Sequence, residues 1–171
     1  MVQKYNTLVF TLALRMIKNR EDAEEVAQDV FVKAYQALTS FKGDSKFSTW
    51  LYRITYNTCL DMLSRKRRQP STCDLEQLPH VDLQELENAL DKMEANEKEK
   101  QIKRAINLLP EDEAFLITLY YFDEQSIKEA AKITGLSESN IKIKLYRARK
   151  RLFTLLEPLI NSAKSTSYER T

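Results

Sequence analysis

The sequence is poor in the residues that interrupt helices. Its 171 residues include 2 glycines and 4 prolines. These residues, Gly43 and Gly135 with Pro70, Pro79, Pro110 and Pro158, fall between periodic stretches, where helices are expected to end. We therefore expect an all-α protein.

Residues that build catalytic and metal sites are equally few. Cys59 and Cys73 form neither a CxxC pair nor a zinc pattern, and His80 has no second imidazole to join it. The sequence has no glycine-rich phosphate loop and no convincing pair of nucleophile and base. We expect reduced thiols, no metal, no cofactor, no small-molecule substrate and no enzymatic activity.

Long apolar runs are also missing. None approaches the roughly 20 residues that span a bilayer, and the N-terminus lacks the charged and then apolar layout of a signal peptide. The sequence therefore predicts a cytoplasmic protein.

Charge is nearly balanced overall, at +2, but it is unevenly distributed. Residues 1–69 carry 12 Lys and Arg against 7 Asp and Glu, whereas residues 74–100 carry 3 against 9. Two basic segments thus flank an acidic middle.

Three helices are predicted before the acidic segment. Residues 2–17 are apolar enough for a buried helix. Asp22 and Glu25 have the spacing of a capping box at the start of a second helix. Its apolar face is predicted to comprise Ala23, Val26, Ala27, Val30, Phe31, Ala34, Tyr35 and Leu38.

A loop at residues 40–46, with its turn at Gly43, separates the second helix from a third at about residues 47–67. The predicted inner stripe of this third helix is Phe47, Leu51, Ile54, Thr58 and Met62. A neighbouring face then carries Trp50, Arg53, Asn57 and Asp61.

Composition divides the chain into two small helical domains, 1–69 and 101–160. An acidic linker at 70–100, mostly flexible with a possible short helix at 82–90, joins them, and a tail covers 161–171. Helical periodicity resumes at residues 102–109, stops at Pro110, and returns at 114–122.

A helix-turn-helix is predicted next. Ser126 is placed to cap a helix over 127–134, Gly135 can take the left-handed conformation at its end, and Ser137 can cap the following helix. Ala131, Ile133 and Leu136 are expected between the two helices. The inner stripe of the second helix is Ile141, Leu145, Ala148 and Leu152.

Residues 141–151 hold six basic side chains and no acidic one: Lys142, Lys144, Arg147, Arg149, Lys150 and Arg151. An α-helix fits the major groove of DNA, where lysine and arginine bind guanine edges or phosphates. A basic run alone is more often a solvated helix face. Together with the short first helix, the glycine turn and the second cap, it favours DNA binding.

Two separated segments resemble one family. Residues 20–68, with the runs DAExxxQxxF and FxGxSxFxTWLYRI, are similar to the promoter-melting domain of extracytoplasmic-function (ECF) sigma factors. Residues 103–152, ending in KLYRARKRL, resemble that family's second domain. The resemblance implies an RNA polymerase sigma factor, with core polymerase, promoter DNA and an anti-sigma factor as partners.

The resemblance also implies roles for individual residues in the first domain. Glu25, Gln28 and Asp29 would contact the polymerase, although capping alone could explain Glu25. Trp50, Arg53 and Asn57 would read the −10 element and hold an unstacked base, and Trp50 could instead belong to the core. The implied phosphate contacts beside them are Arg65, Lys66, Arg67 and Arg68.

For the −35 element, the implied contacts of the second domain are Lys142, Ile143, Lys144, Tyr146, Arg147, Arg149 and Lys150. Three features depart from the family pattern. Ile143 stands where small polar residues are common, the loop before Ser126 lacks a frequent glycine, and a further helical segment generally precedes the first apolar helix.

Two other functions stay open from the residues alone. A helix-turn-helix regulator that binds operator DNA without being a sigma subunit would explain residues 126–152 equally well. It would not explain the FSTWLYRI helix and its basic end. An all-helical adaptor that binds only protein would make the basic face incidental.

Overall fold

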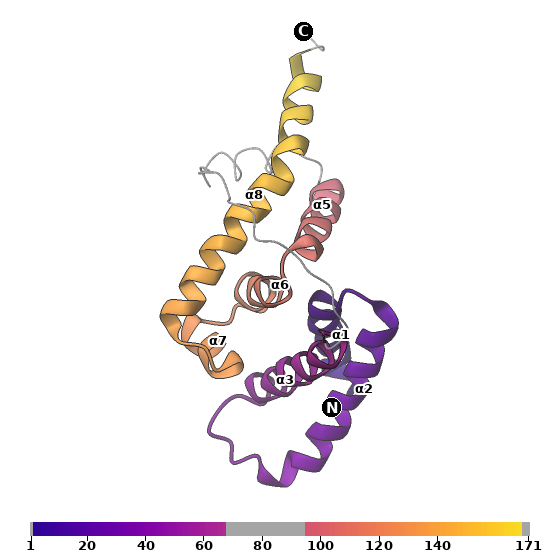
Figure 1. The fold of residues 1–171 in the computed structure, drawn as a ribbon, viewed down its shortest axis with the longest axis vertical. Coiled ribbons are helices and arrows are strands. Elements are labelled where there is room, and N and C mark those ends of the chain that lie inside the picture. Colours follow the sequence, from indigo (N-terminus) through magenta and orange to yellow (C-terminus); the bar gives the residue numbers. More distant parts are fainter. Residues whose placement is uncertain (1, 68–94, 169–171) are drawn as a thin grey trace.

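The computed structural model describes residues 2–67 and 95–168, and it describes side chains at 5–67 and 98–158. The first half comprises α1 (Val2–Ile17), α2 (Arg20–Ala37), the 3-10 turn η1 (Leu38–Ser40) and α3 (Phe47–Arg67). The second comprises α5 (Ala95–Leu108), α6 (Glu111–Ile117), the π-helical turn η2 (Thr118–Phe122), α7 (Ile127–Thr134) and α8 (Glu138–Tyr168). These ranges contain no β-strand, so the all-α prediction is confirmed (Figure 1).

In the first half, α1, α2 and α3 pack on one another. The buried side chains of α2 have the predicted helical spacing and are Ala23, Val26, Ala27, Val30 and Ala34. The predicted stripe was wrong at its end, because Tyr35 is 81% exposed and Leu38 is 37% exposed. The apolar residues of the sequence continue at helical spacing past Ala34, the last residue of α2 that is buried against the neighbouring helices.

The predicted cap of α2 was also wrong. The N-cap is Asn19, whose side-chain oxygen accepts a hydrogen bond of 3.0 Å from the backbone N–H of Asp22. Asp22 lies in the first turn, and its carboxylate pairs with Lys66 of α3. Asn and Asp side chains can both cap a helix. Asn19 takes this role because the helix begins at Arg20, two residues before Asp22.

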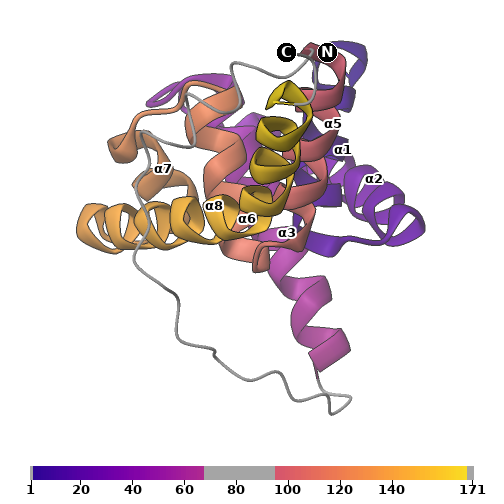
Figure 2. The same ribbon diagram turned by 90° about the horizontal axis from the view of Figure 1, so that it is seen from above.

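In the second half, α6 lies between α8 and the first three helices in both views (Figures 1 and 2). Phe115 of α6 and Leu119 of the following turn η2 are fully buried. α8 differs from the prediction, because it runs without a break past Pro158 to Tyr168. Pro158 therefore lies inside a helix, and residues 161–168 of the predicted tail are helical.

One apolar core spans both halves of the described chain. It includes Leu12 and Leu51 of the first half together with Phe115 and Ile133 of the second. α1 packs against α6, and α3 packs against α7. The predicted linker and its possible short helix at 82–90 lie outside the described residues up to 94, and residues 95–100 belong to α5.

Candidate nucleic-acid interface

The exposed face of α3 carries the residues that were predicted to read DNA. Arg53 and Asn57 are both exposed and stand one helical turn apart. Leu60, 38% exposed, continues the same side of the helix. This face offers a guanidinium, an amide and an apolar group to an incoming partner.

Trp50 lies at the beginning of this face and is half-buried. Its ring centroid is 5.1 Å from that of Phe41 and 5.4 Å from that of Phe47. Tyr5 extends the cluster to α1, 5.4 Å from Phe47. Trp50 thus packs in an aromatic cluster while staying partly exposed, and its contact with DNA stays a prediction.

The basic end of α3 is partly neutralised within the molecule. Lys66 pairs with Asp22 of α2, and Arg67 Nη2 lies 3.3 Å from Glu111 Oε2 of α6. Arg65 is exposed, and Arg68 lies outside the described residues. The predicted phosphate contacts therefore include two residues that also hold helices together.

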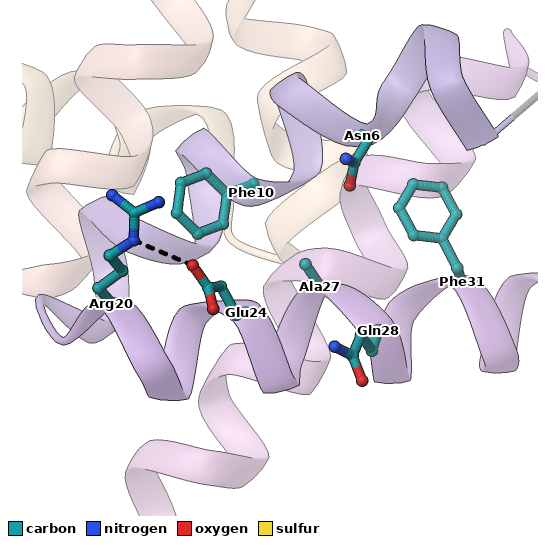
Figure 3. A pocket seen from close by; sticks show the side chains of 7 residues that line it. All are labelled: Asn6, Phe10, Arg20, Glu24, Ala27, Gln28 and Phe31. Carbon is teal, nitrogen blue, oxygen red and sulfur yellow. Dashed lines mark hydrogen bonds and ion pairs between the residues drawn. The ribbon is translucent and has the colours of Figure 1, made fainter.

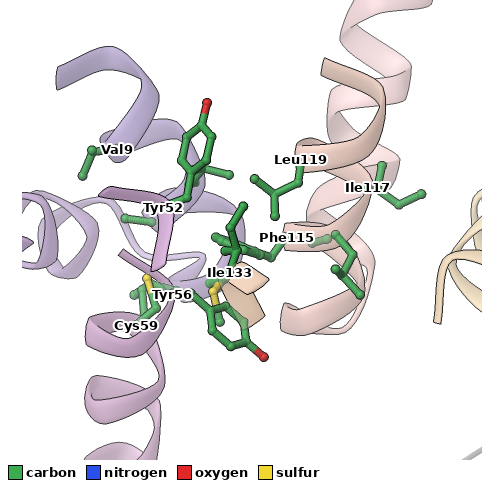
Figure 4. Packing of buried hydrophobic residues seen from close by; sticks show 14 of the residues in the cluster. Val9, Tyr52, Tyr56, Cys59, Phe115, Ile117, Leu119 and Ile133 are labelled. Atoms are coloured by element: carbon green, nitrogen blue, oxygen red, sulfur yellow. The ribbon is translucent and has the colours of Figure 1, made fainter. Parts of the chain in front are cut away.

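A second buried stripe on α3, beside the exposed face, was not predicted from the sequence. Tyr52, Tyr56 and Cys59 are buried in the shared core, facing the second half of the chain (Figure 4). Burial raises the pKa of the Cys59 thiol to about 12, which makes it a poor nucleophile. Their i, i+4, i+7 spacing was a visible signal for a second buried stripe.

The helix-turn-helix has the predicted geometry. Ser126 and Glu129 form a reciprocal capping box, and the C-cap Gly135 has φ of 75°. The Ser137 hydroxyl accepts from the backbone N–H of Asn140 at 3.2 Å, which caps α8. Four of the expected side chains are buried, namely Ile133, Ile141, Leu145 and Ala148. The other three, Ala131, Leu136 and Leu152, are partly buried against the core, and Ala130, which was not predicted, is buried.

Much of the α8 surface outside its buried stripe is exposed. Lys142 and Arg147 are exposed, Ile143 is 51% exposed and Tyr146 is 44% exposed. The Lys150 ammonium lies 4.8 Å from the centre of the Tyr146 ring, a cation–π contact. We call these five residues the outer face of α8.

The other basic residues of α8 lie on its flanks and have partners. Lys144 pairs with Asp112, and Arg151 Nε lies 3.2 Å from Glu113 Oε2, both at the beginning of α6. On the other flank, Arg149 donates a hydrogen bond of 3.2 Å to the Tyr121 hydroxyl. Sequence periodicity did not reveal these partners, because they come from a different helix.

The exposed side of α2 carries the predicted polymerase contacts Glu25, Gln28 and Asp29. Gln28 also lines an open groove of about 640 Å³ between α1 and α2 (Figure 3). Two large neighbours are also exposed, Val32 at 55%, which was not predicted, and Tyr35 at 81%, which was predicted to be buried. Exposed apolar side chains beside polar ones are typical of a protein interface.

Within residues 2–67 and 95–168, no cluster of three or more His, Cys, Asp or Glu side chains is suited to bind a metal ion. No helix in these same ranges is long and apolar enough to cross a membrane.

Comparison with protein families gives two matches. The sigma-70 region 2 family matches residues 1–69, and the sigma-70 region 4 family matches residues 99–152. The two regions occur in the order that the sequence motifs predicted.

Individual relatives agree. The RNA polymerase sigma-H factor of Pseudomonas aeruginosa is 32% identical over 170 residues, covering 95% of this chain and 88% of that protein. The ECF RNA polymerase sigma-E factor of Escherichia coli K12 is 34% identical over 166 residues, covering 94% and 86%.

Two solved structures share the fold. The sigma factor RpoE from Bartonella quintana, crystallised with the anti-sigma factor NepR, matches with a TM-score of 0.67 at 24% identity, covering 91% of this chain and 94% of that one. CnrH in complex with the cytosolic domain of CnrY matches with a TM-score of 0.54 at 25% identity, covering 92% and 85%.

Proposed function

This chain belongs to the ECF group of RNA polymerase sigma factors, and from that premise we propose how its exposed faces divide promoter recognition between them. As a sigma factor it directs core polymerase to promoters with −10 and −35 elements and initiates transcription. We assign the −10 element to residues 1–69 and the −35 element to residues 101–160.

The exposed face of α3 would read the −10 element. The side chains of Arg53 and Asn57 project from this face and are exposed, so packing within the protein does not explain them. An amide can pair with a base edge, and the accessible part of Trp50 or the Arg53 guanidinium can stack on an unpaired base. Arg65, Lys66, Arg67 and Arg68 would bind the phosphates beside that base.

The −35 element would meet the outer face of α8. Lys142, Arg147 and Lys150 supply the charge that phosphates and guanine edges attract, and Ile143 and Tyr146 supply apolar surface. Lys144 and Arg149 belong to the predicted contacts as well. To bind DNA, Lys144 would have to leave Asp112, and Arg149 would have to leave Tyr121.

The exposed side of α2 would bind core polymerase. Glu25, Gln28 and Asp29 provide polar contacts, and Val32 and Tyr35 add apolar area that a monomer has no other reason to expose. This surface lies on a different helix from either DNA face, so the three partners need not compete.

The same proposal covers partners and location. We propose that the chain is a non-enzymatic initiation subunit acting in the cytoplasm, where polymerase and promoter DNA are found. An anti-sigma factor is the expected inhibitor, since the related Bartonella quintana protein was crystallised with one.

The observation that carries this proposal is the presence of both sigma regions, in order, on one chain. The rival helix-turn-helix regulator accounts for only the second region. The deciding experiment is run-off transcription with purified core polymerase and a library of promoter fragments. Specific transcripts that require both the chain and the core enzyme are expected. DNA binding without any polymerase-dependent transcript would overturn the proposal.

A further inference from the structure

The six basic side chains of residues 141–151 are not equivalent. At 100° per residue, Arg147 and Lys150 point away from the buried stripe of α8, and Lys142 lies exposed on the flank opposite to that of Lys144. Lys144 and Arg151 lie together on one flank, the flank that faces α6. Contact with α6 therefore separates a flank set, Lys144 and Arg151, from an outer set, Lys142, Arg147 and Lys150.

The flank set meets the acidic first turn of α6. Lys144 pairs with Asp112, and the two side chains are only 26% and 32% exposed. The Arg151 side chain is 26% exposed, and that of its partner Glu113 is 7% exposed. Burial raises the pKa of Glu113, and Arg151 is the strongest influence that opposes this rise.

Asp112 is itself held in place. Its Oδ1 accepts a hydrogen bond of 3.0 Å from the backbone N–H of Glu113, which leaves Oδ2 for Lys144. A carboxylate in the first turn of a helix is also stabilised by the helix dipole. The carboxylate is thus fixed by its own helix before it binds the lysine.

We propose that Asp112 is a positioning residue that binds Lys144 to α6 and keeps this lysine from contacting DNA. Asp112 thereby fixes the number of phosphates that α8 neutralises. The inference rests on the proposed binding of DNA by the outer face of α8, and it removes Lys144 from that contact set. It also makes Asp112 a determinant of how strongly the chain binds DNA of any sequence.

The physical reason is the cost of exchange. To reach a phosphate, Lys144 would have to leave a partly buried partner, and the freed Asp112 carboxylate would then stand near the negatively charged backbone. A cation already neutralised by the protein displaces no counterion from DNA. It therefore contributes nothing to the salt dependence of binding.

The test is the slope of log affinity against log salt for the full-length chain, with a labelled duplex of mixed sequence, about 20 base pairs long, as the probe. Each new phosphate contact steepens this slope by about 0.9. We expect Lys142→Ala to make it shallower by about that amount and Lys144→Ala to leave it unchanged. Asp112→Asn, which keeps the Oδ1 acceptor, should steepen it by about 0.9 by releasing Lys144.

Two further variants separate this effect from others. Glu21→Gln changes the net charge equally, but Glu21 lies exposed in the first turn of α2 and not in α6, so the slope should stay unchanged. In the double variant Asp112→Asn with Lys144→Ala, the slope should return to the native value.

If Lys144→Ala made the slope as shallow as Lys142→Ala does, or if Asp112→Asn behaved like Glu21→Gln, the role of Asp112 would be rejected. Two other outcomes would instead reject the underlying assignment of α8 to DNA. One is that the native chain shows no salt-dependent binding, and the other is that Lys142→Ala keeps the native slope.

Discussion

The ring of Tyr56 in α3 lies 4.9 Å from the ring of Phe115 in α6, and this contact joins the two halves of the chain (Figure 4). Polar contacts also join the two halves. Arg15 of α1 donates a hydrogen bond of 3.0 Å to the Lys103 carbonyl, and Lys18 donates to that of Leu109. Aromatic pairs of this kind contribute beyond their buried area, so the two halves should stabilise each other.

Phe115→Ala should therefore destabilise the first half although the change lies in the second. Truncation of a fully buried phenylalanine costs about 3–5 kcal/mol. Trp50 is the single tryptophan of the chain and lies within the first half, so its fluorescence reports on that half alone. We expect the urea midpoint of Trp50 fluorescence to fall together with that of circular dichroism.

Leu108→Ala is the control for this experiment, because Leu108 is 67% exposed in the second half and its truncation should move neither midpoint. If the two halves were independent, the urea midpoint of Trp50 fluorescence in Phe115→Ala would stay at the native value, while part of the circular dichroism signal was lost at lower urea.

Asp123 should make stability depend on pH. Burial raises its pKa from 3.8 to about 6, and its charge in turn helps to raise the pKa of Tyr52 in α3. Because the folded chain binds this proton more tightly than the unfolded chain, ionised Asp123 costs stability above about pH 6. The cost disappears below about pH 4, where both states are protonated.

Asp123→Asn should then stabilise the chain by about 1 kcal/mol near pH 8, a figure reduced for solvent screening of a half-exposed group. The gain should shrink as pH falls from about 6 and vanish near pH 4. Denaturant midpoints at both pH values would measure it, with exposed Asp44→Asn as the control. A gain of equal size at the two pH values would contradict this role of the charge.

Two substitutions on α3 should affect promoters differently. Asn57→Ala should weaken promoter opening and relax selectivity at one −10 position, because a base-edge contact discriminates by about 1–3 kcal/mol. Arg65→Ala should weaken binding to all promoters alike and lower the salt slope. Arg65 is the better phosphate probe, because Arg67→Ala would also break the ion pair with Glu111.

Open-complex formation by the reconstituted holoenzyme, on promoters varied at each −10 position, would compare the two variants. Identical sequence profiles for Asn57→Ala and Arg65→Ala would mean that the two roles had been assigned wrongly.

The sequence predicted the helices well where local chemistry decides them. Ser126, Gly135 and Ser137 determine the helix-turn-helix through capping and turn preferences, which act within a few residues. The Asn19 cap was missed because neighbouring polar residues compete for that role. Asn19 and Asp22 are both suitable caps, and the sequence alone does not show at which residue the helix begins.

Contacts between distant segments could not be predicted in the same way. Periodicity identified one buried stripe on α3, but Tyr52, Tyr56 and Cys59 form a second stripe whose partner lies in the other half. The six basic residues of α8 looked alike in sequence. Their division into outer and flank sets depends on the acidic turn of α6, which only the packing of α6 against α8 brings near.

The last prediction concerns Ile143, which is 51% exposed on the outer face of α8 between Lys142 and Arg147. An apolar side chain on a face that binds DNA is suited to the methyl group of thymine, the apolar group in the major groove. We expect a thymine in the −35 element at the position that Ile143 covers. Burial of a methyl group contributes about 0.8 kcal/mol, which corresponds to about a fourfold change in affinity.

Uracil in place of thymine removes only that methyl group. At one −35 position, a thymine-to-uracil change should weaken binding of the native chain about fourfold. It should leave the affinity of Ile143→Ser nearly unchanged, because that variant has no apolar group to lose. Ile143→Val, which keeps a branched apolar side chain, should retain sensitivity to the change. If no position distinguishes the native chain from Ile143→Ser, the methyl contact does not exist, and the exposed isoleucine needs another partner.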